Sequence, residues 1–387
     1  MDISLFTEQK TGRVIEISGL SGISHAFVPD PLPLGWEWSD ELWPVLVQAK
    51  EELARLDGIG RHLPNPQLLL TPLQRREAQR SSSLEGTYAT PQQLLLFEIN
   101  PAEVEVSGER TQPVREVANY GRALRLREEM KEKLPVSLRM IRELHRVLLE
   151  GVRGSEAEPG QFRRGQVQIG SEGRFVPPPS NYLAECLDLF EKYLYQEKSF
   201  DPLVEAFLVH YQFEAIHPFR DGNGRVGRLL LAIIIEDWCG LSGQWLYMSP
   251  YFERYKDEYI DRLFRISTDG DWIGWLRFCL QGVTAQSLDA QKRCSRLLEL
   301  KEEYRQRLDR TASPGRIYQI LEDLFIQPFT TAPWIKDKYQ VSYPTARADL
   351  DRLMILDILS DLQLRLRRQK AYLCQDIFQI TYEDIDI

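Results

Sequence analysis

The sequence has few cysteines and no closely spaced pair of them. None of its five cysteines belongs to a Cys-x-x-Cys motif, which excludes a zinc ribbon and indicates reduced thiols in a cytoplasmic location. They are Cys186, Cys239, Cys279, Cys294 and Cys374. The longest purely apolar run, Leu229 to Ile235, is far too short to cross a bilayer. The opening residues, MDISLFTEQK, lack a basic segment followed by an apolar one, so we expect no secretion signal and no membrane partner.

An excess of basic residues is also absent. The net charge of −9 disfavours a protein that coats nucleic acid, although it leaves room for one basic patch. No Gly-x-x-x-x-Gly-Lys-Ser/Thr sequence occurs, which disfavours a P-loop kinase or ATPase. The 387 residues, 43% hydrophobic and 27% charged, are typical of a globular chain with two or three domains.

Apolar residues recur at spacings of three and four along most of the chain, which predicts a mainly α-helical fold. The expected helices cover Trp38–Gly58, Leu69–Ser83, Val114–Lys133, Ser137–Leu149, Tyr182–Glu197 and Pro202–Ile216. The first ~35 residues contain a β-like run from Arg13 to Ile17 and are expected to form an arm on the next domain.

Two further segments depart from this helical pattern. Residues 165–176 (GQVQIGSEGRFV) alternate like two short strands around a Ser-Glu-Gly turn, which predicts a β-hairpin. Such a hairpin is either a structural plug or an edge that pairs with another backbone. After a long polar helix expected over Gln286–Arg310, the chain from Ser313 has the pattern of three helices and a strand pair, typical of a winged helix-turn-helix.

One motif carries the strongest chemical signal: HPFRDGNGRVGR, residues 217–228, between two apolar helical segments. A helix that starts in a glycine turn has free N–H groups and a partial positive charge, so Gly222 to Gly224 form a plausible anion cradle. Arg225 and Arg228 are three apart and would face the same anion. Asp221 could hold a divalent cation bridging phosphates, and His217 could act as a neutral base. The combination predicts transfer chemistry on a nucleotide phosphate, with Phe219 anchoring the loop in the core.

The motif resembles the Fic-domain signature, His-x-Phe-x-Asp/Glu-Gly-Asn-Gly-Arg-x-x-Arg, and matches it at every defined position. The likeness extends over roughly residues 115–285, including PGQFRRGQVQIG, which resembles the strand-turn flap of these domains. The resemblance implies a Fic-type helical bundle with a small hairpin flap. It also implies a protein adenylyltransferase that moves AMP from ATP to a Tyr, Thr or Ser hydroxyl and releases pyrophosphate. Relatives that phosphorylate proteins differ at the Gly-Arg part of the motif, which this chain keeps as Gly224-Arg225.

The resemblance also implies a role for each motif residue. His217 would be the base that deprotonates the target hydroxyl, Asp221 the Mg²⁺ ligand and Asn223 a phosphate contact. Arg225 and Arg228 would clamp the phosphates. Gly222, Gly224 and the neighbouring Val226 and Gly227 would complete the cradle for ATP.

Residues outside the motif are implied in the same way. The flap residues Val167, Gln168, Ile169 and Gly170 would border the nucleotide, and the flap would dock an unidentified target protein by strand addition. Tyr259 and Ile260 fall where the family lines the adenine and ribose pocket, although this chain carries one extra residue before Gly270.

A second motif precedes the core. SSSLEG, residues 81–86, resembles the inhibitory signature Ser/Thr-x-x-x-Glu-Gly/Asn of some Fic proteins. Ser81, Glu85 and Gly86 occupy its defined positions, and the glutamate would pair with Arg228. A carboxylate on that guanidinium would deny it to the γ-phosphate of ATP. In isolation the pattern is also that of a serine-rich helix end with a solvated glutamate.

We expect four parts: 1–113 with the inhibitory motif, a catalytic core over 114–285, a linker helix over 286–312, and a winged-helix-like domain over 313–387. This last domain has Arg347 and Arg352 on one helix and Arg365, Arg367, Arg368 and Lys370 on the expected wing. Its nine basic and eleven acidic residues favour dimerisation or target docking over DNA binding. We therefore expect a homodimer.

Two other classes of function remain open. One is a non-catalytic, DNA-binding regulator with a nucleotide-sensing Fic core. The other is a zinc hydrolase, because His210, Glu214 and His217 share a helix face at spacings of four and three. This spacing is not His-Glu-x-x-His, which disfavours the zinc reading.

Overall fold

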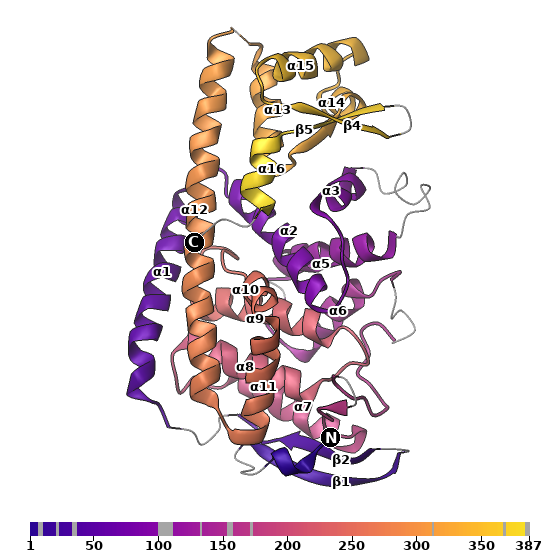
Figure 1. Ribbon diagram of the computed structural model, residues 1–387, viewed down its shortest axis with the longest axis vertical. Helices are drawn as coiled ribbons and strands as arrows, with labels where there is room; N and C mark the ends of the chain where they lie inside the picture. The colour runs from indigo at the N-terminus through magenta and orange to yellow at the C-terminus, as the bar shows by residue number, and fades with distance from the viewer. Residues whose placement is uncertain are drawn as a thin grey trace.

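The computed structural model describes residues 1–6, 11–20, 23–32, 37–99, 111–131, 134–152, 158–170, 173–311, 313–366 and 369–383. The molecule is mainly helical, as the sequence predicted (Figure 1). The long helix α12 (Trp272–Asp309) runs along one side with α1 (Trp43–His62) packed against it. Within these described ranges, no helix has the length and apolar character needed to span a membrane.

A helical bundle fills the centre of the molecule. α8 (Pro202–Ile216) and α9 (Asn223–Trp238) pack against each other in its middle, and nearly all their residues are buried. A helix that is apolar on all faces is stable only in such a core position. Around this pair lie α2 (Gln67–Leu84), α5 (Thr111–Met130), α6 (Leu138–Leu148), α7 (Ser180–Tyr195), α10 (Ser249–Arg254) and α11 (Lys256–Asp269). α3 (Pro91–Ile99) lies farther out and packs against α5. The helices predicted over 69–83, 114–133, 137–149, 182–197 and 202–216 are confirmed to within a few residues.

The boundaries of α1 differ from the prediction. A short 3-10 turn (Asp40–Leu42) precedes the helix, and the side chain of Ser39 makes no capping hydrogen bond. The helix also continues through Gly58 to His62. Gly60 faces the ring of Trp245 so closely that a Cβ there would lie 2.3 Å from Cε2 of the indole. This glycine permits close helix packing instead of ending the helix.

The N-terminal arm lies on the bundle, as expected, but it forms two strands where one β-like run was predicted. β1 (Gly12–Leu20) and β2 (Ile23–Pro29) pair antiparallel. The Thr11 hydroxyl donates to the carbonyl of Ile266 on α11 at 2.8 Å, and the Phe27 amide donates to the carbonyl of Val176 at 2.8 Å. The arm therefore braces both α11 and the end of the flap.

The predicted hairpin over 165–176 is wrong in detail, because the described part of the flap contains one isolated bridge in place of two strands. Ile169 and Phe175 exchange backbone hydrogen bonds of 2.9 and 3.1 Å. Gly170 and Gly173 adopt left-handed φ angles of 79° and 68°, which curl the chain away from an extended ladder. The predicted turn residues Ser171 and Glu172 lie outside the described residues.

The helix predicted over Gln286–Arg310 is the second part of α12, which begins at Trp272. The expected boundary at 285/286 therefore falls inside a continuous helix. Buried residues on both sides of it, including Val283 and Ala290, belong to the main core. The division of the chain into four parts stays a prediction.

A C-terminal unit follows α12, and its hydrophobic core is shared with the end of α12 and with Leu68 of α2. It contains α13 (Gly315–Ile326), β3 (Phe329–Thr331), α14 (Ala332–Tyr339), α15 (Tyr343–Ile355), β4 (Ser360–Leu366), β5 (Gln369–Leu373) and α16 (Gln375–Tyr382). The strands form an antiparallel sheet in the order β3-β5-β4. The three helices and strand pair agree with the prediction, whereas β3 and α16 were not predicted. Arg367 and Arg368 of the expected wing lie outside the described residues, and the winged-helix assignment stays a prediction.

A buried network of charges joins α2 to α12 and α16. Asp289 on α12 pairs with Arg76 of α2 at 2.5 Å and with Arg293 at 2.9 Å. Arg293 also donates to the carbonyl of Thr381 on α16 at 3.2 Å. Burial raises the pKa of Asp289, but the two arginines outweigh burial and hold it below its ordinary value. The carboxylate therefore stays charged between two buried cations.

We predict that Asp289→Ala destabilises the protein by about 3–5 kcal/mol, because it leaves buried guanidinium groups without their anion. Asp188→Ala is the control, since the Asp188–Lys192 pair is exposed on α7 and contributes at most about 0.5 kcal/mol. Urea denaturation measures both. A difference between the two variants below about 1 kcal/mol would contradict the role given to Asp289.

Candidate active site

The site is built around the sharp turn between α8 and α9. α8 ends at Ile216 because Pro218 disfavours helical geometry in the residue before it. His217 takes a left-handed conformation with φ of 50°, and Gly222 does the same with φ of 78° before α9 begins at Asn223. The first amides of α9 lack helical acceptors, so this turn places His217 beside a helix N-terminus able to bind an anion.

The imidazole of His217 has one ring nitrogen bound and one without a partner among the described residues. Its Nδ1 lies 3.3 Å from the carbonyl oxygen of Glu214, which can only accept, so Nδ1 carries the proton. Nε2 makes no hydrogen bond within the described residues and is left with a free lone pair. Burial lowers the pKa of His217 to about 4, and the guanidinium of Arg163 adds to the effect. The ring is therefore neutral at pH 7.

Arg163 holds the turn in place, and the sequence analysis did not identify it. Its buried guanidinium donates to the carbonyls of His217 at 2.8 Å and Pro178 at 2.6 Å, and also to those of Ile216 and Gly165. Its own amide donates to the carbonyl of Pro218 at 2.9 Å. Burial lowers the pKa of Arg163 to about 10. This arginine satisfies the carbonyls at the end of α8 and fixes the backbone of the base.

His145 on α6 supports the turn from the other side and was also missed. Its Nδ1 accepts from the amide of Gly160 at 2.8 Å, so Nε2 carries the proton and donates to the carbonyl of Asp221 at 3.0 Å. The ring of Phe219 stacks on it with centroids 3.7 Å apart. Phe219 is fully buried, as predicted for the anchor of the loop. No pattern in the sequence links His145 to the motif, because the contact depends on helix packing.

The side chain of Asn223 is directed at the loop backbone. Its Oδ1 accepts from the Phe219 amide, and its Nδ2 donates to the Phe219 carbonyl, both at 2.8 Å. The residue is 2% exposed. This geometry gives Asn223 a role in shaping the turn, and its predicted phosphate contact stays a prediction.

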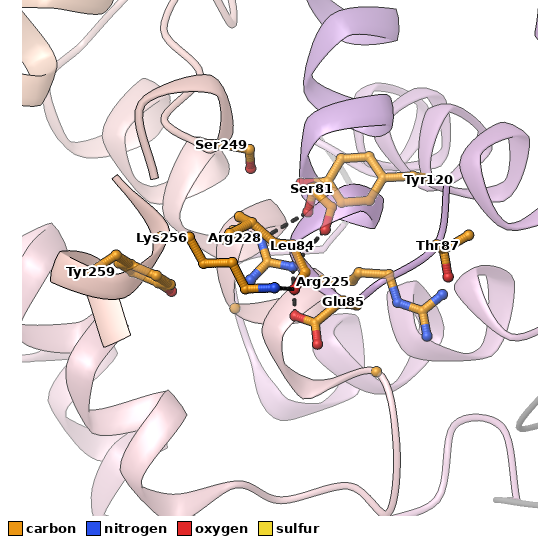
Figure 2. A network of polar contacts seen from close by, with 12 residues as sticks. Ser81, Leu84, Glu85, Thr87, Tyr120, Arg225, Arg228, Ser249, Lys256 and Tyr259 are labelled. Atoms are coloured by element: carbon orange, nitrogen blue, oxygen red, sulfur yellow. Dashed lines mark hydrogen bonds and ion pairs between the residues drawn. The ribbon is translucent and has the colours of Figure 1, made fainter. Parts of the chain in front are cut away.

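Arg228 joins the catalytic motif to the predicted inhibitory motif. Its guanidinium donates to the Ser81 hydroxyl at 2.9 Å, the Ser81 carbonyl at 2.8 Å and Oε1 of Glu85 at 2.8 Å (Figure 2). Burial lowers the pKa of Arg228, but the carboxylate of Glu85 outweighs burial and raises it overall. Burial likewise raises the pKa of Glu85, and Arg228 brings it below its ordinary value. The two groups form a charged pair at neutral pH.

The end of α2 presents Glu85 to the motif. Gly86 has a left-handed φ of 77°, which ends the helix directly after Glu85. Lys256 of α11 donates to the carbonyl of Leu84 at 2.8 Å. A Cβ on Gly224 would lie 2.1 Å from Oε1 of Glu85. Glu85 thus lies against the first turn of α9, where the cradle was predicted.

The two arginines of the predicted phosphate clamp contact different carboxylates, and the clamp itself stays a prediction. Arg225 pairs with Glu116 of α5 at 3.2 Å, and Thr87 donates to the same carboxylate oxygen at 2.7 Å. Figure 2 shows Arg225 extending toward Thr87, whereas Arg228 extends toward Ser81 and Glu85. Spacing alone placed both arginines on one face, but the buried carboxylate of Glu116 draws Arg225 to another partner.

A cavity of about 270 Å³ lies in front of this arrangement. Eight of the predicted site residues line it: Glu85, Ile169, Gly170, His217, Gly224, Arg228, Tyr259 and Ile260. Those that do not are Ser81, Gly86, Val167, Gln168, Asp221, Gly222, Asn223, Arg225, Val226 and Gly227. Lining residues that the sequence analysis did not assign to the nucleotide site include Arg174, Phe175, Glu214, Lys256, Leu263 and Phe264. The flap and α11 contribute apolar side chains, whereas the turn and α2 contribute charged ones.

The flap is fastened over this cavity by Arg174. Its guanidinium donates to Asp261 of α11 at 2.8 Å and lies 4.1 Å from the ring centroid of Phe264. Arg174 thus ties the flap, whose Ile169 and Gly170 line the cavity, to α11.

The alternative of a zinc hydrolase is not supported by the geometry. His210 has both ring nitrogens occupied, by the carbonyl of Gly227 at 3.2 Å and the hydroxyl of Tyr259 at 2.9 Å. Burial lowers the pKa of His210 to about 3. Among the described residues, no three His, Cys, Asp or Glu side chains are grouped as a metal site. His210 is a packing residue that orients Tyr259.

Two family profiles match this chain. Residues 43–126 match the Fic/DOC family N-terminal profile, and residues 135–235 match the Fic/DOC family profile. The first region contains the Ser81–Glu85 segment, and the second contains His217, Arg228 and the cavity-lining part of the flap.

Curated relatives carry the name protein adenylyltransferase Fic. The protein from Drosophila virilis is 35% identical over 160 residues, which is 41% of this chain and 30% of the relative. The protein from Drosophila grimshawi is 42% identical over 106 residues, covering 27% and 21% of the two chains. This chain thus spans less than a third of the length of these relatives.

Solved structures share the fold. A Fic family protein from Desulfovibrio desulfuricans G20 superimposes with a TM-score of 0.56 at 19% identity, covering 88% of this chain and 97% of its own. Fic-1 from C. elegans gives a TM-score of 0.50 at 23% identity, covering 68% and 75%. Residues 43–126 and 135–235 of this chain thus match the two Fic/DOC profiles, and the solved structures show that the chain shares the fold of Fic proteins.

Proposed function

We propose that the protein is an adenylyltransferase that moves AMP from ATP to a Tyr, Thr or Ser hydroxyl of a target protein or of itself. The proposal rests on one observation: neutral His217 and the buried guanidinium of Arg228 line the same cavity, beside the first turn of α9. The names of the curated relatives support the same activity. The proposed substrate is ATP, and the products are pyrophosphate and the adenylylated hydroxyl.

The residues of the turn can perform this chemistry. Nε2 of His217 would take the proton of the target hydroxyl as its oxygen forms a bond to the α-phosphorus. The bond from the α-phosphorus to the bridging oxygen breaks, and pyrophosphate leaves with the electron pair. The amides of α9 and the guanidinium of Arg228 would stabilise the negative charge on the phosphates.

Asp221 fits the proposed magnesium ligand. Its side chain is half exposed, and Oδ1 accepts from the Gly222 amide at 2.7 Å. Arg225 is 3.9 Å away, so the carboxylate keeps open coordination positions. Magnesium is usually held by one or two carboxylates together with substrate phosphates. Asp221, directly before the Gly222–Gly224 turn, can supply the carboxylate. A bound Mg²⁺ would neutralise charge on the phosphates.

We also propose that Glu85 inhibits this activity. Its carboxylate occupies the guanidinium of Arg228 and lies against Gly224. A triphosphate that binds Arg228 or the backbone at Gly224 must displace the Glu85 carboxylate or bind in an unproductive pose. The flap, with Val167 to Gly170, would then dock the target segment by backbone pairing.

The C-terminal unit is proposed to serve dimerisation or target docking. Its acidic balance disfavours phosphate binding, and two of its basic helix residues are engaged with acids: Arg316 with Asp349 and Arg347 with Asp351. The alternative of a non-catalytic DNA-binding regulator would require a basic face that these pairs weaken. All five cysteines are free thiols, which supports a reducing, cytoplasmic location.

Glu85→Gly should raise self-labelling from ATP labelled on the α-phosphate by about tenfold or more, because it removes a charge-assisted bond that competes with ATP. His217→Ala in the same background should abolish labelling. Mass spectrometry identifies the added AMP and the modified residue. The proposal of inhibition fails when the Glu85→Gly protein labels no faster than wild type.

Asp221→Asn should raise the magnesium concentration needed for half-maximal labelling by about tenfold, because a neutral amide is a weaker ligand for a hard cation. The titration is done in the Glu85→Gly background, with chelator as the zero point. An unchanged magnesium requirement would remove Asp221 from the metal site.

The full chain should sediment as a dimer and should not retard duplex DNA at about physiological salt, given the acidic C-terminal unit. Retardation that weakens steeply with salt would favour the regulator alternative.

A further inference from the structure

The carboxyl group of Glu214 has no hydrogen-bond donor among the described residues. The residue lies on α8 one helical turn before His217, and its side chain lines the cavity. Its Oε1 is fully buried without a partner. Leaving a buried acceptor unsatisfied costs about 1–3 kcal/mol, so such groups are uncommon and call for an explanation.

Packing holds this carboxyl where it is. A Cβ on Gly227 of α9 would lie 2.2 Å from Oε1 of Glu214. The glycine within the motif therefore leaves the space that the carboxyl occupies. Burial raises the pKa of Glu214 to about 7, even though Arg228 acts to lower it. Whether ionised or neutral, a carboxyl group still offers an acceptor oxygen.

The position of Glu214 in the cavity limits what its partner can be. Its charged neighbours are Arg228, which lowers its pKa, and Glu85, which raises it. These residues mark the end of the cavity assigned to phosphate. Leu263 and Phe264 of α11 contribute apolar side chains to the same cavity, suited to a base, whereas Tyr259 lies near Arg228 and Glu214. In ATP, the ribose hydroxyls are the hydrogen-bond donors between the phosphates and the base.

We propose that Glu214 accepts a hydrogen bond from a ribose hydroxyl of the bound nucleotide and so selects ribonucleotides over deoxyribonucleotides. The inference rests on the proposed nucleotide site and assigns to it a specificity-determining residue. Nucleotide binding would supply a donor on the cavity side of the carboxyl group, which has none among the described residues.

The test compares ATP with 2′,3′-dideoxy-ATP by isothermal titration calorimetry in the Glu85→Gly protein, where the phosphate site is open. We expect ATP to bind about tenfold or more tightly, the effect of one hydrogen bond to an acidic group. Glu214→Ala should reduce this preference below about twofold, since it removes the acceptor. Glu214→Gln keeps one acceptor oxygen and should retain part of the preference. Glu143→Gln, on the exposed face of α6, is the matched control and should keep all of it.

The outcomes separate this inference from the proposed function. The role of Glu214 is overturned when the Glu85→Gly protein prefers ATP over 2′,3′-dideoxy-ATP by the same factor with and without the Glu214→Ala substitution. The absence of any preference in the Glu85→Gly protein does so as well. A protein that keeps the expected pattern of binding but transfers no AMP contradicts the adenylyltransferase activity and supports the role of Glu214.

Discussion

The guanidinium of Arg228 is the constraint on which the rest of the site depends. It is buried at the start of α9, its bonds to Ser81 fix its orientation, and its remaining face meets Glu85. A buried cation needs an anion, and that face can serve only one anion at a time. The same contact therefore stabilises the resting protein and opposes the triphosphate proposed as its substrate. In this account, inhibition and catalysis compete for one side chain.

His217, the proposed base, is positioned by residues remote from the motif in sequence. Arg163 fixes the carbonyls at the end of α8, and His145 holds the far side of the turn through Asp221 and Phe219. Because each contact is buried, the ring of His217 needs little rearrangement to act as a base. The helix that precedes Glu85, α2, is joined to α12 through the buried Arg76–Asp289 pair. The helix that carries Glu85 is thus packed rigidly against the C-terminal half of the chain.

Local signals in the sequence predicted much of this structure. Helical periodicity located the bundle, and the expected pairing of Glu85 with Arg228 is present, whereas the bonds from Arg228 to Ser81 were not predicted. The failures have physical causes. Spacing could not reveal that Glu116 attracts Arg225, or that the glycines of the flap reduce a hairpin to one bridge. The predicted helix end at Gly58 is wrong because the helix continues to His62, with Gly60 packed against Trp245. Arg163, His145 and the role of Glu214 depend on tertiary contacts that carry no pattern along the chain.

The most direct measurement is a crystal structure of the Glu85→Gly protein with a non-hydrolysable ATP analogue and magnesium. The account predicts a phosphate oxygen on the guanidinium of Arg228 in the place that Oε1 of Glu85 now occupies. It also predicts the α-phosphate against the first turn of α9, with Nε2 of His217 facing the position of the incoming hydroxyl. A triphosphate bound away from Arg228, or a His217 ring turned from the α-phosphate, would contradict it.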